Sequence, residues 1–355
     1  MDYGFVFPAG IRIYEDVAFA ERHGFTHAWL YDSQMLFSDP YASLCLCAVN
    51  TKTIRLGTGV TNPESRIAPV TANSIATVNE LAPGRAILGI GTGNTARRTL
   101  GMPASKLEVM RDHIRICRDL FAGKTTDYTE GDRHRKIRFL NPDADWYNIK
   151  TKIPIYIAAS GPKSLEMAGE IADGVILFGA VSPSLIDFVM DHVKAGAARV
   201  GRDPSEVYAL CMTAFHLTGK DEQLETSKVR QAVGPFVSSC TNIFALSNPD
   251  PMTLPADLRD DIVKFRDIYK VPAGPIETRH LEMYSDYLLG FKQEHEAVVS
   301  EKIIRATTLT GTAEEIVEAV QNMKKAGIHQ VAIQPIVDNR KTVEVFAKEI
   351  IPRVK

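Results

Sequence analysis

The segment 53–101 constrains the fold more than any other part of the sequence, because it contains two apolar runs that each end in glycine. Residues 54–60 form the first run and include LGTGV, and residues 85–90 form the second and lead into GIGTG. Between them the pattern predicts a helix over Ala68–Leu81, which a Pro-Gly pair terminates. A strand, a helix and a second strand in this order are typical of a parallel sheet. Glycine at a strand end lets the backbone approach a flat or anionic ligand, so the segment also predicts a binding site.

The same alternation of strand and helix continues along the chain. Eight strands are predicted, at residues 3–7, 27–31, 54–60, 85–90, 153–158, 175–178, 206–217 and 331–334. Eight strands alternating with helices favour a (β/α)8 TIM barrel over an open doubly wound sheet, so residues 1–355 are predicted to form a single barrel domain. Two segments do not fit the repeat. Residues 124–152 are predicted to be a loop insertion, and residues 221–303, which follow strand seven, a helical insertion or lid.

The composition excludes several classes of protein. The 41 basic and 43 acidic residues give a net charge of −2, which leaves no basic excess for a nucleic-acid surface. No apolar run approaches the roughly 18–20 residues of a membrane-spanning helix. The N-terminal MDYGFVFPAG has no basic region before its apolar run, so it predicts a first strand rather than a signal peptide. Five cysteines without paired spacing predict a cytoplasmic protein, and Cys45 and Cys47 are predicted to pack in the core rather than bind a metal.

The carboxyl ends of the strands are the predicted binding face, because in a TIM barrel they lie together on one side. These ends carry small or polar residues: Asp32-Ser33, Gly57 to Asn62, Gly91 to Asn94, Ser160 to Pro162, and Gly179-Ala180. Such residues suit a wide planar ligand held largely by the backbone, whereas large apolar side chains would indicate a purely structural face. We therefore predict that this face binds a ligand.

Two of these strand ends suit an anion. Ser160 and Gly161 precede a predicted helix, whose free N–H groups and positive dipole end favour a phosphate. Gly179 and Ala180, at the end of the next strand, could donate to the same anion. Ordinary helix capping explains the SGP run equally well, and the sequence leaves both interpretations open. The run GIGTGN lacks the third glycine of the dinucleotide fingerprint, and the residues after it do not fit that fingerprint's helix, so we reject a dinucleotide-binding fold.

Few side chains in the sequence suggest acid–base chemistry. Asp32 is the one acid predicted at a strand end, although a carboxylate there can also cap the next turn. The histidines at positions 113, 192 and 295 lie in helical patterns and are predicted to be surface or core residues, and a solvated face is the favoured interpretation of the basic run 133–136. No metal-ligand spacing, G-x-S-x-G elbow or Cys–His pairing occurs. A glycine-lined face with few acid–base groups indicates a cofactor that brings its own reactivity.

Together these motifs resemble those of the bacterial luciferase-like family of flavin and deazaflavin F420 enzymes. The resemblance is carried by LGTGVTNP at residues 56–63, SIAT at 74–77, GRA at 84–86, LGIG at 88–91, ASGPK at 159–163, ADG at 172–174 and GTAEE at 311–315. It covers nearly the whole chain except residues 124–152 and 221–303. In motif the chain is most similar to the methylenetetrahydromethanopterin reductase branch, which shares the GVTNP and LGIG runs. The resemblance also implies a homodimer or a higher homo-oligomer.

The resemblance implies a cofactor across the carboxyl ends of the strands, with a non-proline cis peptide at Gly59-Val60 behind its ring. On this basis the candidate catalytic residues are Asp32, Ser33 and Asn94. The candidate cofactor-binding residues are Thr58, Gly59, Val60, Thr61, Asn62, Gly91, Ser160, Gly161, Pro162, Gly179 and Ala180. Among these, Ser160, Gly161, Gly179 and Ala180 would bind the cofactor's phosphate.

The chain departs from the family pattern at a few positions. Many F420 enzymes have Asp-His where this chain has Asp32-Ser33, and the methanopterin reductases carry acids where it has Val6 and Asn94. The loss of acids that would hand a proton to a substrate favours oxygen chemistry. We therefore expect a monooxygenase that takes reduced FMN from a partner flavin reductase and uses O2 to oxygenate a small organic substrate, for example a heterocycle. The alternatives are an F420-dependent oxidoreductase that transfers a hydride without oxygen, and a non-catalytic flavin-binding relative.

Overall fold

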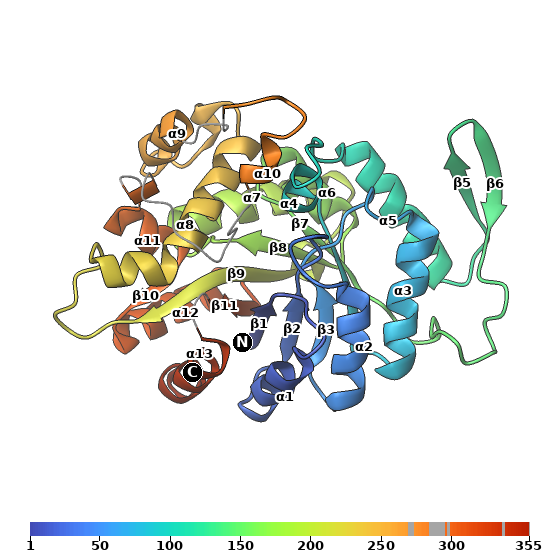
Figure 1. Cartoon of the computed structure of the whole chain (residues 1–355), viewed down its shortest axis with the longest axis horizontal. Coiled ribbons are helices and arrows are strands. Elements are labelled where there is room, and N and C mark those ends of the chain that lie inside the picture. Colours follow the sequence, from blue (N-terminus) through green and yellow to red (C-terminus); the bar gives the residue numbers. More distant parts are fainter. Residues whose placement is uncertain (269–272, 284–294, 297–298, 336–337, 355) are drawn as a thin grey trace. The chain divides into compact units, whose positions relative to one another are not determined.

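The computed structural model describes residues 1–268, 273–283, 295–296, 299–335 and 338–354, and its strands and helices alternate along most of the chain (Figure 1). Eight parallel strands, β1, β2, β3, β4, β7, β8, β9 and β11, close into a barrel. Their hydrogen-bonded order is β9-β11-β1-β2-β3-β4-β7-β8, and β8 pairs again with β9. The predicted (β/α)8 fold is therefore confirmed, with the eight strands at the predicted places.

The chain divides into two compact units, of which one contains residues 7–22 and 26–157. Its barrel strands are β2 (His27–Leu30), β3 (Arg55–Thr58), β4 (Ala86–Ile90) and most of β7 (Ile155–Ala158). Its helices are α1 (Tyr14–Arg22), α2 (Pro40–Asn50), α3 (Ala68–Leu81), α4 (Asn94–Arg98) and α5 (Leu107–Phe121). Figure 1 shows α2, α3 and α5 in succession outside β2 and β3. Because each helix returns the chain to the start of the next strand, the loops after β2, β3 and β4 all lie at the carboxyl ends of the strands.

The other unit contains residues 1–6, 23–25 and 158–355. Its strands are β1 (Asp2–Phe7), β8 (Gly174–Phe178), β9 (Tyr208–Leu217), β10 (Leu309–Gly311) and β11 (Gln330–Gln334). The last residue of β1, Phe7, belongs to the first unit. Its helices are α6 (Pro162–Ile171), α7 (Pro183–Arg199), α8 (Ser227–Ser247), α9 (Arg259–Ile268), α10 (His280–Met283), α11 (Glu301–Thr307), α12 (Ala313–Lys325) and α13 (Asn339–Glu349). Single 3-10 turns occur at Pro204–Glu206, Pro251–Thr253 and Ile351–Arg353.

Glycine makes room for the largest core side chain of the barrel. Trp29 on β2 is fully buried, and it lies opposite Gly57 on β3 in the parallel register. A Cβ atom at position 57 would lie 2.5 Å from the indole Cζ3 atom, so no other residue fits beside this ring without a shift. The ring of Tyr156 on β7 packs at 5.8 Å from the same indole. Gly57 therefore serves the core, although it belongs to the glycine-rich run that predicts a binding site.

Two elements were not predicted from the sequence. The run after β4 forms the short helix α4, whose five residues are too few to show a helical period. Gly93 precedes it in the left-handed conformation, with φ of 76°, and this conformation lets the chain turn sharply from strand to helix. The short strand β10 was not predicted, because its three residues are too few to show a period. Helix α12 begins with a capping box: Thr312 accepts from the Glu315 amide, and Glu315 accepts from the Thr312 amide at 2.8 Å.

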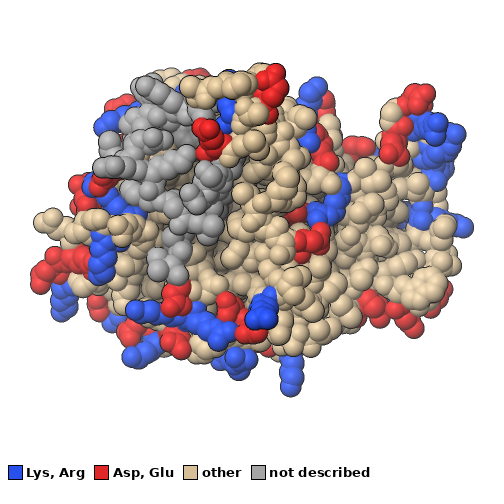
Figure 2. All heavy atoms as spheres, in the orientation of Figure 1, with Lys and Arg blue, Asp and Glu red and all other residues tan. Residues whose placement is uncertain are grey.

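The segment 124–152 contains an antiparallel hairpin of β5 (Thr126–Glu130) and β6 (Arg133–Ile137), which projects from α5 and α3 in Figure 1. Its basic run is exposed, and charged side chains of both signs cover the hairpin in Figure 2. His134 and Lys136 contact Asp127 on the neighbouring strand, at 3.1 and 2.9 Å. Two side chains of the basic run therefore find a partner within the hairpin itself.

The segment 221–303 contains helices α8 to α11, as its helical patterns predict. Its positions 269–272, 284–294 and 297–298 lie outside the described residues, and its role as a lid stays a prediction. Within the described part of the chain, no helix combines the length and the apolar character that crossing a bilayer requires. The five cysteines are free thiols; Cys45 is half-buried, and Cys47, Cys117, Cys211 and Cys240 are buried.

Candidate functional site

Asp32, the acid predicted at a strand end, lies just after β2 and is buried, with 2% of its surface exposed. Its Oδ2 atom is 2.6 Å from Nη1 of Arg66, which comes from the loop between β3 and α3. Burial raises the pKa of this carboxyl above its ordinary value, although the nearby guanidinium opposes that rise. Asp32 is thus a buried acid that retains a proton at higher pH than an exposed aspartate does.

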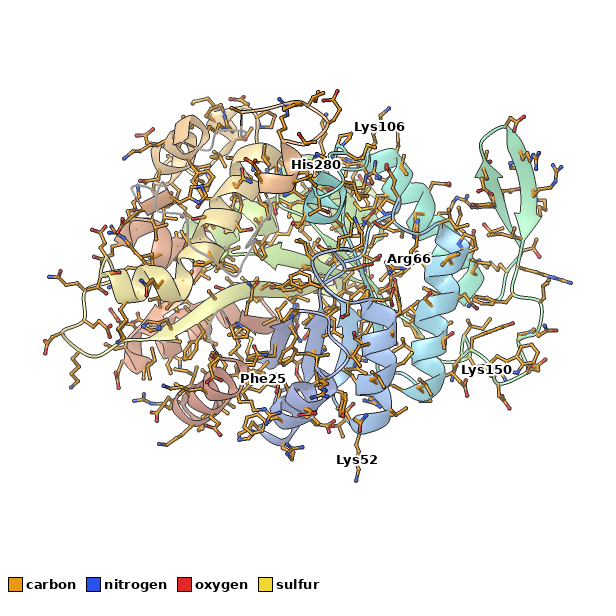
Figure 3. All side chains as sticks on the ribbon, in the orientation of Figure 1. Phe25, Lys52, Arg66, Lys106, Lys150 and His280 are labelled. Atoms are coloured by element: carbon orange, nitrogen blue, oxygen red, sulfur yellow. The ribbon has the colours of Figure 1, made fainter. Side chains whose placement is uncertain are left out.

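Arg66 joins two loops of the same unit, and Figure 3 shows it beside the ends of α2 and α3. Its Nη2 atom lies 2.6 Å from Oδ2 of Asp39, the N-cap of α2, whose Oδ1 atom accepts from the Ala42 amide at 3.0 Å. Its guanidinium also lies over the ring of Tyr41, 4.9 Å from the centroid. One guanidinium therefore bridges two carboxylates of unequal exposure, 2% for Asp32 and 51% for Asp39.

Two buried hydroxyl groups lie beside this ion pair. The hydroxyl of Thr61 is close enough to lower the pKa of both Asp32 and Tyr41. Neither the Thr61 nor the Tyr41 hydroxyl meets hydrogen-bond geometry with any atom of the described residues. Buried hydroxyls without partners are rare in folded proteins, so they mark a place where a ligand or water can bind.

Asn62 organises the loop that carries Arg66. Its Oδ1 atom accepts from the amides of Glu64 and Ser65 at 3.1 and 2.9 Å, and its Nδ2 atom donates to the Ser65 hydroxyl at 2.7 Å. Glu64 then forms an ion pair with Arg97 of α4. Asn62 is fully buried, so its hydrogen bonds hold the turn from the protein interior. Arg66 follows this turn and is therefore attached to a fixed segment of backbone.

The peptide between Gly59 and Val60 is cis, as the family resemblance implies. The Gly59 amide donates to the Leu30 carbonyl at 2.7 Å, and the Thr61 amide donates to the Gly89 carbonyl at 2.9 Å. Thr58 and Thr61 on either side are buried, whereas Gly59 and Val60 are half-buried. The peptide is therefore held between β2 and β4 and keeps part of its surface open to a ligand.

The remaining candidates of this unit are held by local hydrogen bonds. The Thr58 hydroxyl donates to the Gly89 carbonyl at 2.7 Å, and Gly91 donates to the Thr61 carbonyl at 2.9 Å. Ser33 is buried, and its carbonyl accepts from the amides of Leu36 and Phe37. Asn94 begins α4, where its Oδ1 atom accepts from Nε of Arg98 at 2.6 Å. The roles proposed for these residues stay predictions.

The candidates in the other unit lie against helix α8. Gly161 is the N-cap of α6, and its amide donates to the Ser164 hydroxyl at 3.3 Å, while Pro162 begins the helix. Asn248, just after α8, donates to the Ser160 carbonyl at 3.2 Å, and its buried Oδ1 atom has no hydrogen-bond partner in the described part of the chain. Helix capping, one of the two interpretations of this run, is therefore present, and phosphate binding stays a prediction.

Gly179 has a left-handed backbone, with φ of 67°, and packs closely against α8. A Cβ atom at this position would lie 2.2 Å from Sγ of Cys240. Its amide donates to the Met212 carbonyl at 2.8 Å, and the Ala180 carbonyl accepts from the Cys211 thiol at 3.3 Å. A Cβ atom at Gly161 would lie 2.5 Å from the Ser247 carbonyl oxygen, so packing requires glycine at both candidate positions, 161 and 179.

Sequence reasoning missed Arg66, Asp39 and Tyr41. A signal was present, because Arg66 is the only basic residue between the GVTNP motif and the next helix. Cys47 is buried, as predicted, and His113 occupies the core, one of the two places left open for it; burial lowers the pKa of His113 to about 4. Among the described residues no group of three or more His, Cys, Asp or Glu side chains could hold a metal ion.

The chain belongs to the luciferase-like monooxygenase family, whose model matches residues 12–330. A 5,10-methylenetetrahydromethanopterin reductase of Archaeoglobus fulgidus is 29% identical over the whole length of both chains. The corresponding reductase of Methanolobus tindarius is 30% identical, covering 96% of each chain. The structure of the coenzyme F420-dependent tetrahydromethanopterin reductase of Methanopyrus kandleri superposes with a TM-score of 0.73 at 25% identity, covering 100% of this chain and 99% of the other.

The expectation of an FMNH2-dependent monooxygenase is wrong, because these full-length relatives are reductases, and the solved one depends on F420. The alternative, an F420-dependent oxidoreductase, is the better supported one. The chain lacks acids at Val6 and Asn94, but the buried carboxyl group of Asp32 is present just after a strand end, and burial raises its pKa. The absence of acids at two positions is therefore a weak argument for oxygen chemistry.

Proposed function

We propose that this protein is an F420-dependent oxidoreductase that transfers a hydride to or from a small organic substrate. The observation that carries the proposal is the similarity to F420-dependent tetrahydromethanopterin reductase over the whole chain. The deazaflavin, when bound, exchanges a hydride with a carbon of the substrate. A proton moves to or from the substrate in the same turnover, so the reaction also needs a group that can hold one.

The residues after β2 and β3 fit a flat redox cofactor. The half-buried Gly59-Val60 peptide offers a surface without a long side chain at Gly59, and the buried hydroxyls of Thr61 and Tyr41 have no hydrogen-bond partner among the described residues. Gly59 and Val60 would support the ring, and Thr61 would bind its polar edge. Asp32, in turn, would hold the proton, because burial favours its protonated form.

An anaerobic titration tests the proposal. Purified protein is titrated with F420 and, separately, with FMN, and binding is followed by cofactor absorbance and fluorescence. Tight binding of F420, together with hydride exchange that does not consume O2, is the expected result. Methylenetetrahydromethanopterin is the first substrate to test, since the relatives named above act on it. Binding of FMN alone, or of a flavin that stays unreactive, would overturn the proposal and favour a non-catalytic flavin protein.

A variant links the binding data to the site. Val60→Trp places a large ring where the half-buried peptide faces out, and we expect it to weaken F420 binding by more than tenfold. Val109→Trp, on the exposed side of α5, is the matched control, and its affinity should equal that of the wild type. Equal loss in both variants would show that the effect does not come from this site.

A further inference from the structure

The Arg66 guanidinium is shared between a buried and an exposed carboxylate, and this arrangement bears on the ionisation of Asp32. The distances from Arg66 to Asp32 and to Asp39 are both 2.6 Å, so neither carboxylate has the guanidinium to itself. We propose that Arg66 is a positioning residue: it fixes the Asp32 carboxyl group and, through its second ion pair with Asp39, sets how readily that group takes up a proton. That this proton serves hydride transfer rests on the proposed function, whereas its control by Arg66 and Asp39 does not.

The two neighbours act on Asp32 in opposite directions. The positive charge of Arg66 favours the ionised carboxylate, and the negative charge of Asp39 disfavours it. Asp39 also takes up part of the hydrogen-bonding capacity of Arg66, since one arm of the guanidinium is committed to each carboxylate. Burial adds the largest contribution and favours the protonated acid. The charge on Asp32 is thus set by a balance that a single substitution can move either way.

The other titratable groups near Asp32 are either neutral or paired with each other, so they contribute little to its ionisation. Tyr41 of α2 and Cys117 of α5 are buried, and burial raises the pKa of each, so both stay neutral near neutral pH. His113 of α5 lies against the Pro63 carbonyl, and its lowered pKa of about 4 keeps it neutral as well. Glu64 and Arg97 neutralise each other at the far side of the Asn62 turn. Arg66 and Asp39 are therefore the charged groups that decide the ionisation of Asp32.

The pH dependence of stability follows from the sign of the shift. Because the pKa of Asp32 is raised in the folded protein, the unfolded chain loses this proton first as the pH rises. The contribution of Asp32 to stability is present below its ordinary pKa and is lost between that value and the raised one. Removing Arg66 should extend the pH range over which this contribution is lost to higher pH. Removing the charge of Asp39 should narrow that range.

The test is a carboxyl titration of the cofactor-free protein by NMR, with selective ¹³Cγ-aspartate labelling. The Asp32 resonance is identified by its absence in Asp32→Asn. We expect Arg66→Gln to raise the midpoint pH of Asp32 by about 1 or more, because it removes a contacting opposite charge. Arg66→Lys should give an intermediate midpoint, since a lysine keeps the charge but not the forked geometry. Asp39→Asn should lower the midpoint, and asparagine keeps the N-cap of α2.

Arg115→Gln is the matched control, because Arg115 also bridges two carboxylates, those of Asp112 and Asp119, on α5. It should leave the Asp32 midpoint unchanged. Shifts of opposite sign in Arg66→Gln and Asp39→Asn support the proposal, since a loss of packing would move both the same way. If Arg66→Gln does not fold, Asp39→Asn decides: an unchanged or raised midpoint overturns the proposal. A protein that binds no F420 but shows these shifts would refute the proposed function and leave this inference standing.

Discussion

The loops after β3 and β4 and the segments after β7 and β8 both carry glycines at strand ends, yet different interactions hold them. In the first region, side chains connect the loops: Asn62 closes a turn, and Glu64 reaches Arg97. In the second, the backbone packs directly against another helix, with no space for a Cβ atom at Gly179. A glycine in a motif can therefore serve either of two purposes: close approach of a ligand, or close packing of a neighbouring helix. Only the structure distinguishes them.

The largest effect is expected for a substitution in the second region, after β8. Gly179→Ala adds a Cβ atom 2.2 Å from Cys240 Sγ at a left-handed φ of 67°, so backbone strain and overpacking should together cost about 2–5 kcal/mol of unfolding free energy. Gly201→Ala is the matched control, because its φ is 69° and nothing lies within 4 Å of the added atom. It should cost only about 1–2 kcal/mol. Urea unfolding measures both variants.

A double variant separates the two contributions. Adding Cys240→Ala to Gly179→Ala removes the sulfur that the new methyl group would meet, so the overpacking part should be recovered and the backbone part retained. Equal losses for Gly179→Ala and Gly201→Ala would show that packing against α8 does not require glycine. The contrast between the two regions would then fail.

Asn62→Ala tests the first region and should have an intermediate effect. It leaves the amides of Glu64 and Ser65 and the Ser65 hydroxyl without their side-chain partner, and we expect a loss of about 1–3 kcal/mol. The control Ser65→Ala removes the hydroxyl contacts with Asn62 and Gln34 but keeps both amide contacts of Asn62, and it should cost about 1 kcal/mol or less. Thermal unfolding measures both. Similar values for the two variants would mean that the Asn62 side chain does not hold this turn.

The smallest effect is expected for Glu64→Gln, which breaks the ion pair with Arg97 and keeps the size of the side chain. Both residues are partly exposed, so the change should be below about 1 kcal/mol and should shrink further in high salt. Chemical unfolding at two salt concentrations measures it. A loss of several kcal/mol that salt does not reduce would indicate that this pair, rather than Asn62, joins the loops.

The sequence was sufficient for the barrel, because buried strands and amphipathic helices leave periodic patterns that depend on nearby residues. The helix predicted over Ala68–Leu81 has the same bounds as α3. The site was harder, because Asp32, Asp39 and Arg66 lie far apart in sequence and show no common pattern. Asp32 was identified from its place at a strand end, but its partner could not be, since the direction of the loop before α3 depends on the buried contacts of Asn62.

Each of the two tryptophans of the chain reports on a different part of one unit. Trp29 is fully buried against Gly57 inside the barrel, whereas Trp146, which follows the β5–β6 hairpin, is 67% exposed. Their fluorescence should therefore differ in emission wavelength and in access to a quencher such as iodide. A Trp146→Phe protein would carry a single tryptophan, buried in the barrel, so melting of the barrel could be followed by selective tryptophan excitation without a label and without interference from the hairpin segment.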